Sequence, residues 1–489
     1  MSSRNPNLYL SIRRPVRPAL LALAAAAGMV LPLMIGFISA TLSPSVSLQG
    51  AVLCGLVFPA FLIAVLRPKL LVAYTLLVWA VSPELRRLID WSEGTYHSVS
   101  LVSLAPLLAG AAAAIPVMAE IHKIHRVSSR VMMFFIAALG YGSLIGLAKN
   151  GMGSIYDLMN YIIPLLLIPY FAVLRFSRSD LDRMLRAFAN LAVLVAAYGI
   201  IQYLTVPAWD AFWMDSAGMM SIGKPIPLEI RVFSSLNSPG PAATFLTFAL
   251  VPMILEKRWR GALGWLGVLL VVVALLTTLV RASWLILIVM LLVYIGSSSS
   301  KGKWKTLLQI LFVAAALFYI VPKLPGAEGL TARMETLGSI KEDRSYNDRL
   351  NLLNTMVPAV MGNPVGQGIG SVGQSTKLGN GGELGEYGIM DNGFIALFLT
   401  FGLAGGLLFF GGLGAALRSV YKGARRGGEN GIYARLALAA WAGAVASLIS
   451  DNGFPGMKGY LVWMLVGLGL GITQAIDRKE GAAHAATER

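Results

Sequence analysis

The stretch that decides the fold is GALGWLGVLLVVVALLTTLVRASWLILIVMLLVYIG, residues 261–296, in which Arg281 is the only charged residue. Either one long helix crosses a membrane here, or two helices meet in a turn near Arg281. We predict two helices, because a single helix would invert the side of the membrane on which every later loop lies. An ionisable group near a bilayer is costly enough to need a partner. Arg281 is therefore also a candidate functional residue.

The composition excludes a soluble globular protein. The chain has 489 residues, of which 56% are hydrophobic and only 13% are charged, and its mean hydropathy is +0.69. Such a chain has too little polar surface to cover a globule. We predict an all-α polytopic membrane protein with about fourteen transmembrane helices (12–14), since a span of the hydrocarbon core needs about 17 to 25 residues. The expected spans are 19–39, 47–66, 69–83, 99–119, 130–148, 158–175, 187–206, 240–256, 262–279, 281–297, 305–322, 392–416, 432–450 and 457–475.

The charges of the loops predict the orientation. Cytoplasmic loops of membrane proteins carry an excess of arginine and lysine, and alternate loops here hold most of the 40 basic residues. The pattern predicts that both termini are cytoplasmic. The net charge of +16 is spread over these short connectors, which favours contact with anionic lipids rather than with nucleic acid. The single cysteine, Cys54, excludes an intramolecular disulfide.

Two predicted outer loops are long. The first, 207–239, contains Trp209, Trp213 and Met214, which suit a membrane interface. The second, 323–390, includes a predicted helix that begins at Ser345 or Asn347 and ends near Met361. Its apolar face would consist of Leu350, Leu353, Met356, Val357 and Val360. The glycines of GQGIGS, which include Gly368 and Gly370, follow it and mark a tight turn that suits close approach to a phosphate.

Arg231, Arg281 and Arg349 all fall in segments that the loop charges place on the outer side. Arginine presents a planar fork of donors that matches phosphate oxygens. We therefore expect an anionic ligand at the outer boundary, such as a lipid phosphate or diphosphate. A purely structural role stays open for two of these residues: Arg281 could anchor a helical hairpin, and Arg349 could pair with Asp348 or Glu342.

Four segments in order resemble the O-antigen polymerase and ligase superfamily of Wzy-type polymerases and WaaL-type ligases. They are RVFSSLNSPG from Arg231, TTLVRASW from Thr277, the region from Arg349 to MGNPVGQGIG ending at Gly370, and MDNGF from Met390 with FGLAG from Phe401. The resemblance implies a many-helix enzyme of the bacterial cytoplasmic membrane. It would transfer a glycan from undecaprenyl diphosphate to an acceptor sugar hydroxyl at the periplasmic or outer face, without a metal or another cofactor.

The resemblance also implies roles for individual residues. Arg231 and Arg281 match the arginines that bind the diphosphate, and preorganised cations stabilise the negative charge of a leaving diphosphate. The general base of WaaL-type ligases is a histidine at the position of Asp391. Asp391 is either the base or only a helix cap, and Glu383 and Glu386 are alternatives for the base. Arg349, Asn237, Asn392, Gly368, Gly370 and Glu386 are candidate substrate-binding residues.

On this interpretation the chain has three parts. Residues 1–206 form the first seven transmembrane helices, residues 207–416 hold the catalytic core with the outer loops, and residues 417–489 hold the last two helices and a cytoplasmic tail. The expected partners are the carrier-linked oligosaccharide donor, the glycan acceptor and membrane lipids, with a chain-length regulator or another polysaccharide assembly protein as a further partner. DNGF occurs twice, at Asp391 and at Asp451, and local capping explains both.

Other classes of protein fit less well. Asp180 and Asp182 have the spacing of a nucleotide-sugar metal motif, but no nucleotide-binding domain accompanies them. His122 and His125 have no third ligand for zinc. A lipid-linked oligosaccharide flippase would show paired repeats with sites at the membrane midplane, and a peptidoglycan glycosyltransferase of the shape, elongation and division type has fewer crossings. We expect a polymerase rather than a ligase, because aspartate replaces histidine at position 391.

Overall fold

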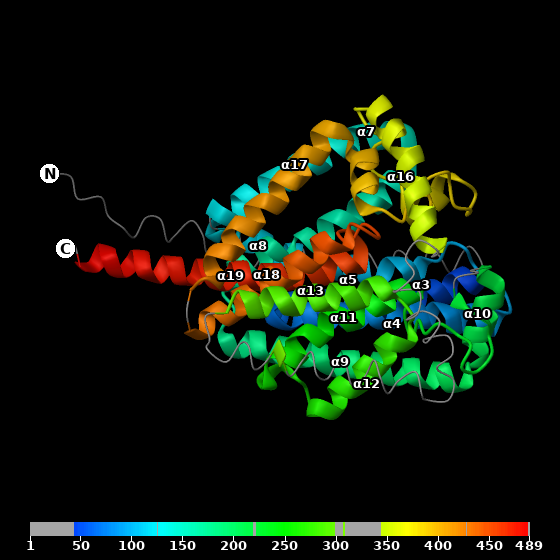
Figure 1. Cartoon of the computed structure of the whole chain (residues 1–489), viewed down its shortest axis with the longest axis horizontal. Coiled ribbons are helices and arrows are strands. Elements are labelled where there is room, and N and C mark those ends of the chain that lie inside the picture. The colour runs from blue at the N-terminus through cyan, green and yellow to red at the C-terminus, as the bar shows by residue number, and fades with distance from the viewer. Residues whose placement is uncertain are drawn as a thin grey trace.

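The protein is a helical bundle. A computed structural model describes residues 44–124, 126–218, 222–298, 307–308, 344–426 and 428–487. In these ranges the only strand-like pairing is a single bridge between Gly223 and Ile230. The longer helices are α3 Pro44–Leu66, α4 Leu71–Glu93, α5 Ala105–Ala111, α6 Ala114–Ala119, α7 Arg126–Leu165, α8 Leu167–Leu174, α9 Arg178–Thr205, α10 Ala208–Ala217, α11 Pro239–Leu255, α12 Gly264–Thr277, α13 Arg281–Gly296, α16 Arg344–Gly362, α17 Gly393–Ala424, α18 Gly428–Ser447 and α19 Gly456–Thr487. Figure 1 shows most of them lying along one common direction.

The all-helical class and the membrane character are confirmed. Within the described ranges, six helical segments are long and apolar enough to cross a membrane, namely Ser45–Leu66, Leu101–Ala119, Arg126–Leu174, Arg178–Thr205, Gly393–Ala424 and Gly456–Gln474. Four shorter apolar helices accompany them, namely Pro239–Leu255, Gly264–Thr277, Arg281–Gly296 and Gly431–Ser447. The predicted spans 19–39 and 305–322 lie outside the described residues, apart from positions 307–308. The count of fourteen crossings stays a prediction.

The connectors that we predict to be cytoplasmic meet at one end of the bundle. Lys69 Nζ lies 2.6 Å from Asp180 Oδ2. Asp182 Oδ1 accepts hydrogen bonds from Trp259 Nε1 at 2.6 Å and from the Tyr433 hydroxyl at 2.8 Å. The C-terminal end of α19 extends from this same end, while α10 and α16 lie at the opposite end (Figure 1). The alternation of loops between the two ends therefore follows the charge pattern.

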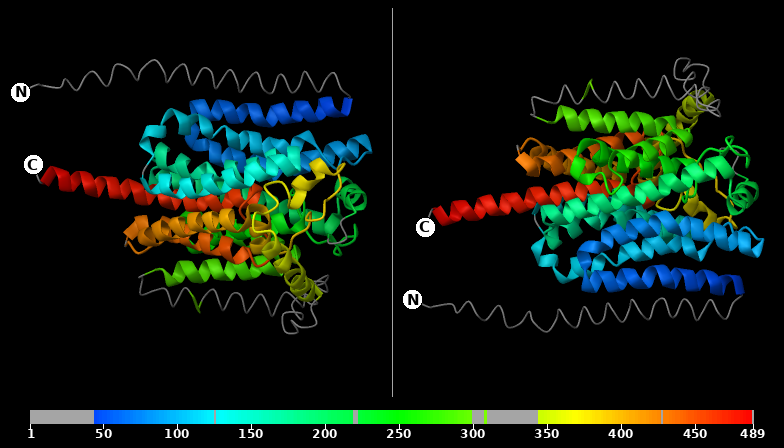
Figure 2. Two further views of the ribbon diagram at one scale, coloured as in Figure 1. Left: turned by 90° about the horizontal axis from the view of Figure 1, so that it is seen from above. Right: turned by 90° about the horizontal axis from the view of Figure 1, so that it is seen from below.

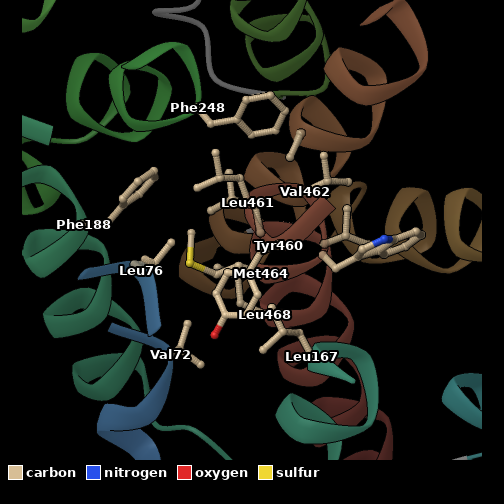
Figure 3. Close-up of a cluster of buried hydrophobic side chains, with 14 of the residues drawn as sticks. Val72, Leu76, Leu167, Phe188, Phe248, Tyr460, Leu461, Val462, Met464 and Leu468 are labelled. Carbon is tan, nitrogen blue, oxygen red and sulfur yellow. The ribbon is translucent and has the colours of Figure 1, made fainter. Parts of the chain in front are cut away.

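Helix α19 lies at the centre of the bundle. Its residues Tyr460, Leu461, Val462, Met464 and Leu468 are buried, and they lie among side chains of α4, α8, α9 and α11 (Figure 3). Between apolar helices in a membrane, close packing rather than burial from water drives association, so small residues are favoured at the contacts. Gly467 and Gly471 of α19 face the backbone of α8, and a Cβ atom on Gly469 would overlap Ala437 of α18. Glycines thus bring three helices together.

Helix α17 is broken, which corrects the predicted single span 392–416. Gly402 has φ 61° and ψ −171°, a conformation that is not helical. The rings of Phe394 and Phe410 stack at 6.0 Å between centroids. In a straight helix these residues would be about 24 Å apart, since each residue adds ~1.5 Å. The chain therefore turns back at Gly402, and the longer arm of α17 runs diagonally across the bundle (Figure 1).

Helix α7 is broken in the same way. Gly151 has φ 52° and ψ −125°, and Phe135 and Tyr161, on either side of it, both pack against Phe409. Two antiparallel arms therefore replace one long helix, in agreement with the separate predicted spans 130–148 and 158–175. The predicted span 99–119 is also divided, into the 3₁₀ helix Leu101–Leu104, α5 and α6.

The glycine-rich loop 366–370 joins the breaks of α7 and α17. Gln367 N donates to Leu399 O at 2.7 Å and Gly368 N donates to Thr400 O at 3.0 Å, just before the break of α17. Ile369 N donates to Gly142 O at 3.0 Å, on the first arm of α7. All three hydrogen bonds join backbone groups. The loop therefore fits only where α7 and α17 expose backbone carbonyl oxygens.

The predicted helix of the large outer loop is confirmed as α16. Its residues Leu352, Leu353, Met356 and Val360 pack with Ile395 and Leu399 of α17. Val357, predicted on the apolar face, is 46% exposed instead. Figure 2 shows α16 at the end of the molecule opposite the C-terminus.

The outer loop 207–239 also forms its own small core. Trp213 and Met214 of α10 pack with Ile222, Ile230 and Phe233. Both side chains are buried within the protein, so they do not face lipid head groups as the prediction of a membrane interface suggested.

Gly402→Ala should destabilise the protein by at least about 2 kcal/mol, because an L-residue at this φ and ψ is strained and the new Cβ would overlap the carbonyl oxygen of Val365. Gly414→Ala is the matched control, since it lies in the same helix with open space around it and should gain up to about 1 kcal/mol. Thermal unfolding of the detergent-purified variants measures both. Equal midpoints would contradict the sharp turn at Gly402.

Lys224 and Lys257 test the orientation. Both are exposed, on loops that we predict to lie on opposite sides of the membrane. In a Cys54→Ser background, Lys224→Cys should react with a membrane-impermeant maleimide in intact spheroplasts, whereas Lys257→Cys should react only after lysis. The reverse pattern would overturn the predicted orientation.

Candidate active site

The turn between α12 and α13 positions Arg281. The predicted division of residues 261–296 into two helices is confirmed, and Arg281 is the first residue of α13. Leu279 adopts φ 56°, which is strained for a residue with a side chain. The buried hydroxyl of Thr278 stabilises the turn, since it donates to Leu275 O at 2.7 Å and accepts from Val280 N at 3.3 Å.

The structure brings Arg231 to the same turn. Arg231 Nε donates to Thr278 O at 3.3 Å, and Val232 N donates to Thr277 O at 3.1 Å. Two arginines from distant segments thus flank one turn at the N-terminus of α13. Since the N-terminus of a helix carries a partial positive charge, cations there are disfavoured and an anion is favoured. The arrangement suits an anionic ligand.

A buried guanidinium group fixes the segment that follows Arg231. Arg87 of α4 is 1% exposed and donates to Ser234 O and to Leu236 O, each at 2.6 Å. Its Nε atom lies 2.9 Å from Asp210 Oδ1, and the group also pairs with Glu84. Asn237, directly after Leu236, is exposed at the surface.

Further polar side chains complete this network. Gln202 accepts hydrogen bonds from Phe233 N at 3.0 Å and from Ser234 N at 2.8 Å, and donates to Asp210 Oδ2 at 2.7 Å. Burial raises the pKa of the Asp210 carboxyl, against the opposing charge of Arg87. A buried polar network of this kind rigidifies the backbone that it surrounds.

A small pocket lies beside Arg281. Four elements meet around it: α11, α13, α19 and the connection between α18 and α19. Its lining consists of Gly240, Thr244, Thr247, Phe248, Val280, Ala282, Ser283, Ile286, Ser447, Ser450, Asp451, Gly453, Lys458 and Val462. Both sequence neighbours of Arg281 line the pocket.

The start of α17 lies against the other side of this region. Gly393 N donates to Leu448 O at 2.7 Å, and a Cβ atom on Gly393 would overlap the carbonyl oxygen of Asp451. Asp391 is exposed and interacts electrostatically with Lys458. The two copies of DNGF are therefore neighbours in space. Asp391 is not part of the pocket lining.

Other predicted site residues have structural roles. The Asn392 side chain is 8% exposed and caps α17, accepting from Ile395 N at 3.0 Å. Gly368 and Gly370 are buried, with their Cα atoms against the backbone of Gly146 and Ser154 in α7. Their glycine identity is explained by this packing, and a contact with substrate stays a prediction.

The remaining predicted residues lie elsewhere in the outer region. Glu386 is exposed in the loop before α17. Arg349 belongs to α16, but its side chain lies outside the described part of the structure. The structure thus brings Arg231 and Arg281 to one turn, whose residues Val280 and Ala282 line the pocket, although neither arginine belongs to the lining itself. It leaves the position of the Arg349 side chain open.

Sequence reasoning missed Lys458, Asp451 and Arg87. Lys458 is the only charged residue in the apolar segment Gly456–Gln474, which is the same signal that identified Arg281. Asp451 begins the second copy of DNGF, which we had interpreted as a helix cap. The role of Arg87 depends on partners more than 100 residues away, which no local pattern shows. Among the described residues, no three histidine, cysteine, aspartate or glutamate side chains gather as metal ligands would.

Comparison with known families confirms the predicted resemblance. Residues 266–410 match the O-antigen ligase family, which supports the O-antigen polymerase and ligase superfamily and suggests a membrane enzyme of that type. The matched region includes Arg281 and Asp391, whereas Arg231 and Lys458 flank it. The search of curated proteins gave no significant match.

Arg87→Leu should destabilise the protein by about 3–5 kcal/mol, because it leaves the buried carboxylate of Asp210 without its cation. Arg183→Leu is the matched control, since it removes an arginine that is 67% exposed and pairs with Asp180, which is worth at most about 1 kcal/mol. Thermal unfolding in detergent compares the two. Similar losses in both variants would show that the network does not support the outer loop.

Proposed function

We propose that this protein is a membrane glycosyltransferase that needs no metal and transfers a glycan from undecaprenyl diphosphate to an acceptor sugar hydroxyl at the outer face of the bacterial cytoplasmic membrane. The observation that supports it best is the meeting of Arg231 and Arg281 at one turn beside a pocket. The family match over residues 266–410 supports the same reaction type.

The two arginines act on the donor. When the bond between the anomeric carbon and the diphosphate oxygen breaks, negative charge develops on the leaving diphosphate. Guanidinium groups held in place before the reaction stabilise that charge without further reorganisation. The positive end of α13 adds to their effect. The hydrogen bond from Arg231 to Thr278 O keeps one arginine at the turn.

Asp391 acts on the acceptor. Its carboxylate takes the proton of the acceptor hydroxyl as the oxygen attacks the anomeric carbon of the donor. Asp391 is exposed and follows a loop that closes against α16 and α17, so a glycan acceptor can reach it from the outer side. Asn392, rather than Asp391, caps α17 through its side chain, which leaves the Asp391 carboxylate available for this role.

The proposed reaction is polymerisation, with carrier-linked repeat units as both donor and acceptor. Aspartate at position 391, where WaaL-type ligases have histidine, favours this choice. Ligation to a lipopolysaccharide core is the alternative, since the matching family is described as an O-antigen ligase. The proposed partners are the lipid-linked donor, the glycan acceptor, membrane lipids and a chain-length regulator.

Arg231→Ala, Arg281→Ala and Asp391→Asn should each reduce transfer at least 100-fold, since removal of one charge-stabilising group or of a positioned base typically costs about 10²–10⁴ in rate. Purified enzyme with synthetic carrier-linked repeat units measures the transfer. A ladder of products supports a polymerase, and single transfer to a core acceptor supports a ligase.

Arg183→Ala serves as control, because Arg183 is exposed near the opposite end of the bundle and should leave the rate unchanged. Normal product formation by both arginine variants would refute the donor site. A normal rate for Asp391→Asn alone would refute only its role as the base.

A further inference from the structure

Lys458 is a third cation beside the turn that holds Arg281. It lies in the first turn of α19 and is the only charged residue between Gly456 and Gln474. Its side chain is 19% exposed and lines the same pocket as Val280 and Ala282, which flank Arg281. A lysine in so apolar a segment needs compensation by a partner or a ligand.

Part of that compensation comes from Asp451. The Lys458 ammonium group donates to Asp451 Oδ2, and Asp391 adds a second, longer-range attraction. An ammonium group has three donors. Within the described residues, Asp451 is the only hydrogen-bond partner of this group. Two donors therefore remain for a ligand in the pocket.

The other polar side chains of the pocket suit a polar ligand beside Lys458. The hydroxyl groups of Thr244, Ser447 and Ser450 each donate to a backbone carbonyl within their own helix or turn. Their donor hydrogens are thus engaged, and among the lining residues Lys458 supplies the charged donor. Such a pocket favours an acceptor-rich, anionic group over a neutral sugar.

We propose that Lys458 contacts the diphosphate of the donor, with Asp451 as the residue that positions its ammonium group. This inference rests on the proposed function and adds a residue outside the matched region 266–410. The ammonium group acts from α19, across the pocket from α13, so the diphosphate lies between cations on two sides. Asp451, which also lines the pocket, holds the lysine there.

The test uses the purified full-length chain in detergent with farnesyl diphosphate as the probe, titrated by calorimetry. Lys458→Met should weaken binding about tenfold, which corresponds to the loss of one charged hydrogen bond. Lys458→Gln keeps a polar side chain and should weaken binding similarly. It replaces Lys458→Met in the measurement if the methionine variant does not fold. Lys458→Arg should restore affinity to within about threefold of the native protein. Lys224→Met removes an exposed lysine elsewhere on the outer side and should leave binding unchanged.

The outcomes separate this inference from the proposed function. If the native protein binds farnesyl diphosphate and Arg281→Ala abolishes binding while Lys458→Met and Lys458→Gln retain it, only the role of Lys458 is overturned. If the Lys458 variants have a lower unfolding temperature but unchanged affinity, the ion pair between Lys458 and Asp451 has a purely structural role. If the native protein does not bind the probe, the donor site itself is overturned.

Discussion

The guanidinium group of Arg87 is the interaction on which the outer end of the bundle depends. It joins α4 to Asp210 of α10 and to the backbone of residues 234 and 236 before α11. Removing such a group from water costs several kcal/mol, so it is tolerated only where carboxylates and carbonyls surround it. Because these contacts fix residues 233–236, they also fix Arg231 and Asn237, which lie on either side. The position of a candidate ligand-binding arginine thus follows from a network that contacts no ligand.

Several local features of this region run against ordinary preferences. Leu279 has a positive φ, Arg281 stands at the positive end of a helix, and Lys458 lies in an apolar segment. Departures from local rules concentrate at functional sites, where stability is given up for a prearranged geometry. Lys458 lines one pocket, and Leu279 and Arg281 belong to the turn beside it, so an anion there would relieve two of the three departures. Their coincidence in space, rather than any one residue, supports the interpretation as a binding site.

The sequence predicted those features that depend on neighbours along the chain. The division at Arg281 and the amphipathic helix α16 follow from charge parity and helical spacing, and both are confirmed. The turn at Gly151 falls between the predicted spans 130–148 and 158–175. The sharp turn at Gly402 was not predicted, because residues 364–368, from another segment, pack against it. The sequence around Gly368 suggested a phosphate-binding loop. The structure explains this glycine by close packing against the backbone of Gly146, a contact that no local pattern shows. Lys458 had the same local signal as Arg281 and was overlooked.

The candidate site combines segments from inside and outside the matched region. Residues 266–410 include Arg281 and Asp391, whereas the pocket wall opposite α13 comes from α19. Helix α19 is also the most enclosed of the six long apolar segments in the described residues, with 83% of its apolar window buried. A cation on such a helix cannot move independently of the core. The backbone that carries Lys458 is therefore part of the core, while the loop before Asp391 lies at the surface. The proposed reaction thus places the donor diphosphate against a fixed helix and the acceptor at an exposed loop.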